Sequence, residues 1–257
     1  MAGAVGIAPT WSLAWRAAQH NPLLLLLAVL ALGGSAEGAV WLLQIAGDAL
    51  LAVPRDYFTM SGAYFILDLT ITLLLRSIFT MFALGMVAKA NVVFSAKGEN
   101  EHGRQIARCL ARAVMAWVAV DLVTGLVATP LTFVDEFYYD LSTAQQVLVS
   151  LGGALLFGFL RAGLASLVFA GLPDRVRLRY QPNIASGRRH LLVCYLILFS
   201  TTGVVSAVAS LLWNSPFAVA RIVYLNTSLD GLLVILLSFA TAARFEGVSP
   251  AEQRVFD

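Results

Sequence analysis

Six long apolar stretches constrain the fold of this chain more than any other feature. A helix that crosses the hydrocarbon core of a bilayer needs about 20 mainly apolar residues, and each stretch reaches that length. They cover residues 22–46, 62–87, 107–129, 145–171, 190–213 and 222–243. The sequence therefore predicts an all-α, polytopic six-helix transmembrane bundle, which forms a single integral membrane domain over residues 1–257.

The charge content agrees with this class of protein. Only 12% of the residues are charged and 59% are hydrophobic, whereas soluble domains carry about 25% charged residues. The formal net charge of +2 gives no reason to expect a nucleic-acid partner. The first stretch has the apolar core of a secretory signal, but it continues through Leu43 for a full span, so we expect it to be retained.

Lysine and arginine residues are distributed unevenly between the predicted loops. With a cytoplasmic N-terminus, the inner segments hold thirteen of the 17 basic residues, and the outer loops hold only Arg55 and Arg221. The outer segment FVDEFYYDLS is acidic. The positive-inside rule therefore places both termini in the cytoplasm, and we expect a bacterial cytoplasmic (inner) membrane. An amphipathic segment near residues 10–19 precedes the first span.

The second stretch contains a polar stripe. In ILDLTITLLLRSIFT, the residues Asp68, Thr72, Arg76 and Thr80 recur every four positions, which places them on one face of a helix. Asp68 and Arg76 are about 12 Å apart along the helix axis, too far for a simple pair. We therefore expect Arg76 to pair with a carboxylate from another helix.

Ionisable residues occur within five of the predicted spans. Each charge in hydrocarbon costs at least about 2.5–3.5 kcal/mol on insertion scales, so these side chains should face the bundle interior. We expect them to form an intramembrane polar network together with one threonine: Glu37, Asp68, Thr72, Arg76, Asp121, Arg161 and Asp230. The carboxylates lie toward the outer third of the spans. For Arg76, the expected partner is Asp121 or Asp230.

Two interpretations of this network remain open. A purely structural network would fix helix rotation and register. Alternatively, four acids against two arginines leave an excess of two carboxylates, which would be protonated or would hold a cation. A proton or cation site within a helical bundle is typical of transporters. The absence of a mid-span proline argues against a transporter.

Small residues recur every four positions along the fourth stretch. This spacing allows a neighbouring helix to approach closely, and we expect a packing face inside the bundle; a face toward another subunit is the alternative. The residues are Ala154, Gly158, Ala162, Ser166 and Ala170.

Two short sequence similarities suggest an internal repeat of helical hairpins. The segments 106–125 and 184–203 each begin with Ile-Ala and end with Thr-Gly. Leu-Asp occurs at residues 67–68 and again at residues 229–230. Similar composition among membrane helices is the alternative explanation.

Five arginines gather in and beside the second inner loop. We expect them to contact anionic lipid headgroups; a docking surface for a partner is the alternative. They are Arg175, Arg177, Arg179, Arg188 and Arg189.

No motif predicts catalysis or metal binding. The three histidines, His20, His102 and His190, have no metal-binding spacing, and HExxH is absent. Cys109 and Cys194 form no metal-binding pair. We therefore expect no catalytic residue, no metal and no cofactor. The sequence favours a non-catalytic membrane subunit or scaffold that assembles with lipids and other membrane protein subunits. The alternative is a proton- or cation-coupled transporter of small solutes.

Overall fold

The computed structural model is helical throughout the residues that it describes. These are residues 6–51, 57–89, 99–132, 141–175, 184–213 and 215–245, and none of them forms a strand. The helices are α1 (Ile7–Gln19), α2 (Pro22–Leu51), α3 (Tyr57–Lys89), α4 (Glu99–Thr132), α6 (Thr143–Phe169), α7 (Leu172–Arg175), α8 (Ile184–Leu212) and α9 (Pro216–Phe245).

Six of these helices are long and apolar enough to cross a membrane, as the sequence predicts. The spans are Pro22–Gly47, Phe65–Lys89, Gly103–Val127, Thr143–Phe169, Gly187–Leu212 and Pro216–Phe245. Their ends lie within six residues of the predicted ends. Pro216 is the first residue of α9, where its missing N–H and fixed φ are tolerated. At the start of α6, the backbone N–H of Ser142 donates to Gln145 Oε1 at 2.9 Å, which satisfies a free helix-end donor.

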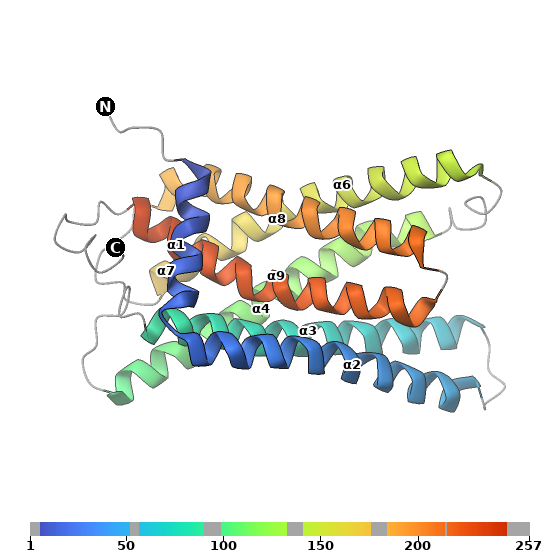
Figure 1. Ribbon diagram of the computed structural model, residues 1–257, viewed down its shortest axis with the longest axis horizontal. Helices are drawn as coiled ribbons and strands as arrows, with labels where there is room; N and C mark the ends of the chain where they lie inside the picture. Colours follow the sequence, from blue (N-terminus) through green and yellow to red (C-terminus); the bar gives the residue numbers. More distant parts are fainter. Residues whose placement is uncertain are drawn as a thin grey trace.

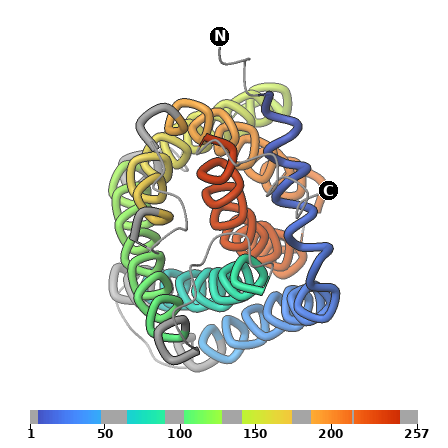
Figure 2. Tube along the Cα trace, turned by 90° about the vertical axis from the view of Figure 1, so that its left-hand side faces the viewer, coloured from blue at the N-terminus to red at the C-terminus, as the bar shows by residue number. Residues whose placement is uncertain are grey.

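The long helices run side by side, and α9 occupies the centre of the bundle (Figures 1 and 2). It packs against α1, α2, α3 and α8. In its most apolar stretch, 67% of the residues are buried, against 11% in α6. A helix that is apolar on all sides is expected in such a central position.

The short helix α1 lies across one end of the bundle (Figure 1). It buries Thr10, Ala14 and Ala18, which are four residues apart and share one face. Arg244 near the end of α9 donates from Nη1 to the backbone oxygen of Gly6 at 2.8 Å. Thr10 Oγ1 lies 2.7 Å from His190 Nε2 on α8. This helix is the amphipathic segment expected near residues 10–19, and its hydrogen bonds tie it to α8 and α9.

The small-residue face of α6 packs against α8 of the same chain. A Cβ atom at Gly158 would lie 3.1 Å from the backbone nitrogen of Ser200, and one at Gly203 would lie 3.1 Å from the oxygen of Ala154. Ala162 and Ser166 are buried along the same face. The two backbones are therefore close enough that only small side chains fit between them.

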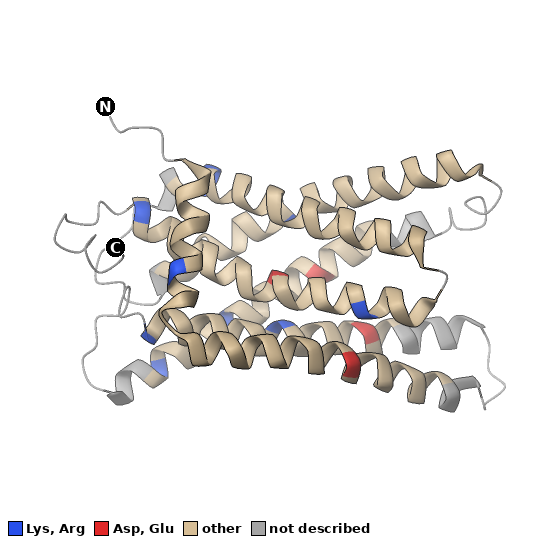
Figure 3. Ribbon diagram, in the orientation of Figure 1, with Lys and Arg blue, Asp and Glu red and all other residues tan. Residues whose placement is uncertain are grey.

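Basic and acidic residues occupy different levels of the bundle. Among the described residues, most lysines and arginines belong to helix segments at the end that carries α1, and the acidic residues belong to segments in the middle or toward the opposite end (Figure 3). The outer surfaces of α2 and α6 expose leucine side chains, with Leu30 at 63% and Leu148 at 70%. Such surfaces suit contact with lipid tails, as expected for an integral membrane protein.

The α6–α8 contact gives a first testable prediction. Replacing Gly158 with leucine should destabilise the protein by about 1–3 kcal/mol, because the backbone atoms of α8 leave no room for a side chain. Thermal unfolding in detergent measures the effect. Gly163→Leu is the matched control, because a Cβ at Gly163 meets no atom of the described residues within 4 Å. Equal losses of stability in the two variants would contradict the packing described above.

Candidate functional site

A buried ion pair joins α3 to α4. Arg76 is completely buried, and its Nη1 donates a hydrogen bond to Asp121 Oδ1. The guanidinium carbon lies 4.2 Å from the centroid of the Trp117 ring, close enough for a cation–π interaction. Trp117 Nε1 in turn donates to Thr80 Oγ1 at 3.3 Å. Arg76 therefore has one of its two expected partners, and an aromatic ring completes its surroundings.

The third helix at this level is α9, which approaches α3 unusually closely. A Cβ atom at Gly231 would lie 3.2 Å from the Cα of Arg76. The adjacent Asp230 is 2% exposed and interacts electrostatically with both Arg76 and Arg161. Gly231 therefore allows α9 to place a buried carboxylate beside the ion pair.

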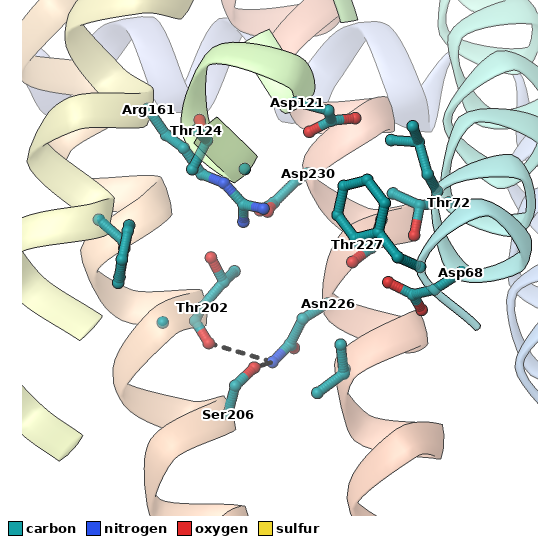
Figure 4. A pocket seen from close by; sticks show the side chains of 16 residues that line it. Asp68, Thr72, Asp121, Thr124, Arg161, Thr202, Ser206, Asn226, Thr227 and Asp230 are labelled. Carbon is teal, nitrogen blue, oxygen red and sulfur yellow. Dashed lines mark hydrogen bonds between the residues drawn. The ribbon is translucent and has the colours of Figure 1, made fainter. Parts of the chain in front are cut away.

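A pocket of about 390 Å³ lies between α3, α4, α6, α8 and α9. Its charged lining residues are Asp68, Asp121, Arg161 and Asp230. Figure 4 shows Arg161 of α6 extending toward Asp230 of α9, with Asp68 on the far side of the pocket. Three carboxylates and one guanidinium from four different helices therefore face the same space.

Hydroxyl and amide groups line the rest of the polar surface. Asn226 Nδ2 donates to the backbone oxygen of Thr202 at 3.1 Å and to Ser206 Oγ at 2.8 Å. Dashed lines mark the hydrogen bonding of Asn226 in Figure 4. Thr72 and Thr227 also face the pocket. These groups can donate or accept hydrogen bonds, so the lining suits a polar occupant.

Several buried charged groups at the pocket have atoms without a hydrogen-bond partner among the described residues. These atoms are Oδ1 of Asp230, Oδ2 of Asp121 and Nε of Arg161. Buried polar atoms are paired in most native structures because an unpaired one costs free energy. Three residues that line the inner part of the pocket therefore each have a buried polar atom whose hydrogen-bonding capacity is unused.

Asp68 occupies the mouth of the pocket. It is exposed, and one carboxylate oxygen accepts a hydrogen bond from the Tyr224 hydroxyl. Phe65, one turn nearer to the start of α3, is 53% exposed. Because Asp121 and Asp230 are buried, the pocket deepens from the end opposite α1 toward the middle of the bundle.

Glu37 does not belong to the predicted polar network. Its Oε1 lies 2.7 Å from Nε of Arg221, and the two side chains are 62% and 44% exposed. The sequence expectation is wrong here because Arg221 lies within α9, one turn beyond its start, and reaches a carboxylate on α2 outside the pocket. The charges at the pocket and its neighbouring ion pair are therefore three carboxylates, one of them at the exposed mouth, against Arg76 and Arg161.

The remaining predicted residues lie elsewhere or outside the described part of the chain. Arg188 and Arg189 are exposed near the start of α8. Arg177 and Arg179 lie outside the described residues, as does the side chain of Arg175. Within the described ranges, no three histidine, cysteine, aspartate or glutamate side chains come together as a metal site.

The Thr-Gly and Leu-Asp dipeptides that suggested an internal repeat all contribute residues to the pocket lining. Thr124-Gly125 and Thr202-Gly203 line it from α4 and α8, and Asp68 and Asp230 line it from α3 and α9. The internal repeat itself stays a prediction, but the positions that suggested it share one location.

Sequence reasoning missed Trp117 and Tyr224. A signal for Trp117 was present, because it precedes Asp121 by four residues and so shares its face of α4. That face meets the Arg76–Thr80 stripe of α3. No comparable signal marked Tyr224, whose contact with Asp68 depends on how α9 packs against α3.

Comparison with protein-family models, with curated proteins and with solved structures gives no match.

The buried ion pair gives a second prediction. Arg76→Met should destabilise the bundle by about 3–5 kcal/mol, because it leaves the buried Asp121 carboxylate without its partner. The double variant Arg76→Met/Asp121→Leu removes both desolvation costs and should recover most of that loss. Unfolding in detergent measures both. Losses that simply add in the double variant would contradict a direct pairing.

Proposed function

We propose that this protein is a non-enzymatic transporter of a small polar solute, which binds in the pocket between α3, α4, α6, α8 and α9. The observation that carries the proposal is the 390 Å³ pocket with the unpaired buried atom Asp230 Oδ1 at its inner end. Small-molecule sites have volumes of about 300–1,000 Å³ and few, convergent polar groups.

A purely structural network explains these features less well. Buried charges that only hold helices together should satisfy one another, because each unpaired polar atom weakens the fold. Arg76 and Asp121 meet that requirement in part, but Asp230 and Arg161 have no ion pair within 4 Å among the described residues. A solute that contacts these groups would supply the missing interactions.

The position of the pocket also supports transport. We propose that the end opposite α1 faces outward and that the termini are cytoplasmic, because the inner segments hold most of the basic residues. The membrane would be a bacterial inner membrane. The pocket-lining helices are continuous at this level, so we expect access to alternate by tilting of whole helices rather than by bending within one.

The excess of carboxylates supports coupling to a proton or cation. Three carboxylates line the pocket region against the two guanidinium groups of Arg76 and Arg161. One negative charge is left over when all five groups are ionised. A proton, a co-transported cation or a positively charged solute would neutralise it and lower the cost of crossing the membrane.

A second proposal is that the chain is an accessory subunit or scaffold in a membrane complex. It is supported by α6, in which only 11% of the residues of the most apolar stretch are buried. Phe159 and Leu156 on this helix are 63% and 60% exposed. Another membrane protein could cover this surface in place of lipid.

The transport proposal predicts uptake by the purified protein in liposomes. Vesicles exposed to a defined mixture of amines, amino acids, carboxylates and sugars should accumulate at least one of them above empty vesicles. Mass spectrometry of the vesicle contents identifies it. Asp230→Asn should reduce its uptake at least about tenfold, because it removes a buried charged contact.

Glu37→Gln is the matched control, because it removes an intramembrane acid outside the pocket, and it should retain uptake. Accumulation of no solute by folded protein would contradict transport. Stable co-migration of that inactive protein with a larger membrane complex in mild detergent would support the subunit role instead.

A further inference from the structure

The side chains that line the pocket include more anionic than cationic groups. Carboxylates come from Asp68, Asp121 and Asp230, whereas Arg161 is the only cationic side chain among the lining residues. Arg76 does not line the pocket and is engaged by Asp121 and Trp117. Ionised carboxylates accept hydrogen bonds and cannot donate them. An occupant that donates hydrogen bonds and carries positive charge therefore fits this lining better than an anion.

The carboxylates of Asp230 and Asp68 line the pocket at different depths. Asp230 is 2% exposed, and its Oδ1 has no partner among the described residues. Asp68 lies at the mouth, where it accepts one hydrogen bond from Tyr224. A cation that enters through the mouth would meet Asp68 first and Asp230 next.

The geometry favours an organic cation over a bare metal ion. No three acidic, histidine or cysteine side chains converge as a metal site in the described ranges. The 390 Å³ volume is also far larger than one ion, since a water molecule in the liquid occupies about 30 Å³. Separate carboxylates around a larger space suit a group with several directed N–H donors, and a protonated amine has up to three.

The apolar part of the lining suits the carbon portion of such a molecule. Phe65 and Phe157 line the pocket together with Leu69 and Val223. Aromatic rings also attract organic cations through their faces. The pocket therefore combines carboxylates for an ammonium group with apolar surface for a short hydrocarbon chain.

We propose that the pocket recognises a small organic cation with a protonated amino group, whose ammonium group contacts Asp230 and whose carbon chain packs on Phe65 and Phe157. This inference rests on the proposed solute-binding role and names the chemical class of the solute. The same ammonium chemistry occurs in the headgroup of phosphatidylethanolamine, so the test separates a free amine from a lipid.

Three probes of equal length but different charge test this inference: butylamine, butanol and butyrate. Each is titrated into the purified full-length protein in detergent, and the thermal unfolding midpoint is recorded. Butylamine should raise the midpoint in a saturable manner, because a ligand that binds only the folded state stabilises it. Butanol and butyrate at equal concentrations should give no saturable shift.

Variants connect the effect to the pocket. Asp230→Asn should weaken the apparent Kd for butylamine at least about tenfold, because a buried charge pair is lost. Glu37→Gln should leave it within about twofold. If Asp230→Asn does not fold, Asp68→Asn at the exposed mouth replaces it and should weaken binding in the same direction.

The other possible results distinguish failure of the ammonium assignment from failure of the transporter proposal. A saturable shift with butyrate alone, or with none of the three probes, would overturn the ammonium assignment, while uptake of another solute in liposomes would still support transport. Stabilisation by phosphatidylethanolamine in phosphatidylcholine nanodiscs, without any effect of butylamine, would support ammonium recognition. It would also assign the pocket to a lipid headgroup and so contradict the transporter proposal.

Discussion

The ion pair between Arg76 and Asp121 is the interaction on which the bundle interior depends. A fully buried guanidinium in a low-dielectric region is tolerated only with a charged partner and further contacts. Asp121 and the Trp117 ring provide these from α4, and Gly231 lets α9 approach the Arg76 backbone. Together, these contacts fix three helices at one level and place Asp230 beside them.

The pocket follows from this arrangement. Asp121 uses one oxygen for Arg76, and its other oxygen is buried beside the pocket without a hydrogen-bond partner among the described residues. Asp230 arrives on α9 and Arg161 on α6, without an ion pair of 4 Å or less between them in the described structure. The charges that stabilise the bundle and those that face the pocket are therefore neighbours, so a bound solute would interact with groups that also position helices.

Patterns within single helices were predictable from the sequence. Contacts between helices, which depend on how the helices pack, were predictable only in part. Length and hydropathy gave the six spans, and the four-residue spacing of Gly158 and Ala162 indicated a packing face. Because burying a lone charge is costly, a partner for Arg76 on another helix was predictable. The sequence did not decide between Asp121 and Asp230. Glu37 was wrongly assigned to the polar network because its pairing depends on how α2 and α9 lie next to each other. The residue spacing within one helix contains no information about that. The contact of Tyr224 with Asp68 depends on the same information.

The central claim is that the bundle interior contains a polar pocket open to water, and thiol labelling tests it most directly. In a background where the buried Cys109 and Cys194 are replaced by alanine, Ser206→Cys places a thiol at the pocket with little change in volume. Val205→Cys places one at the same depth on a side chain that is 47% exposed and expected to face lipid. A membrane-impermeant maleimide added from the outer side should label Ser206→Cys and leave Val205→Cys unlabelled, because only a thiol in contact with water ionises and reacts readily. Failure to label Ser206→Cys in folded protein, or equal labelling of both, would contradict the pocket as described.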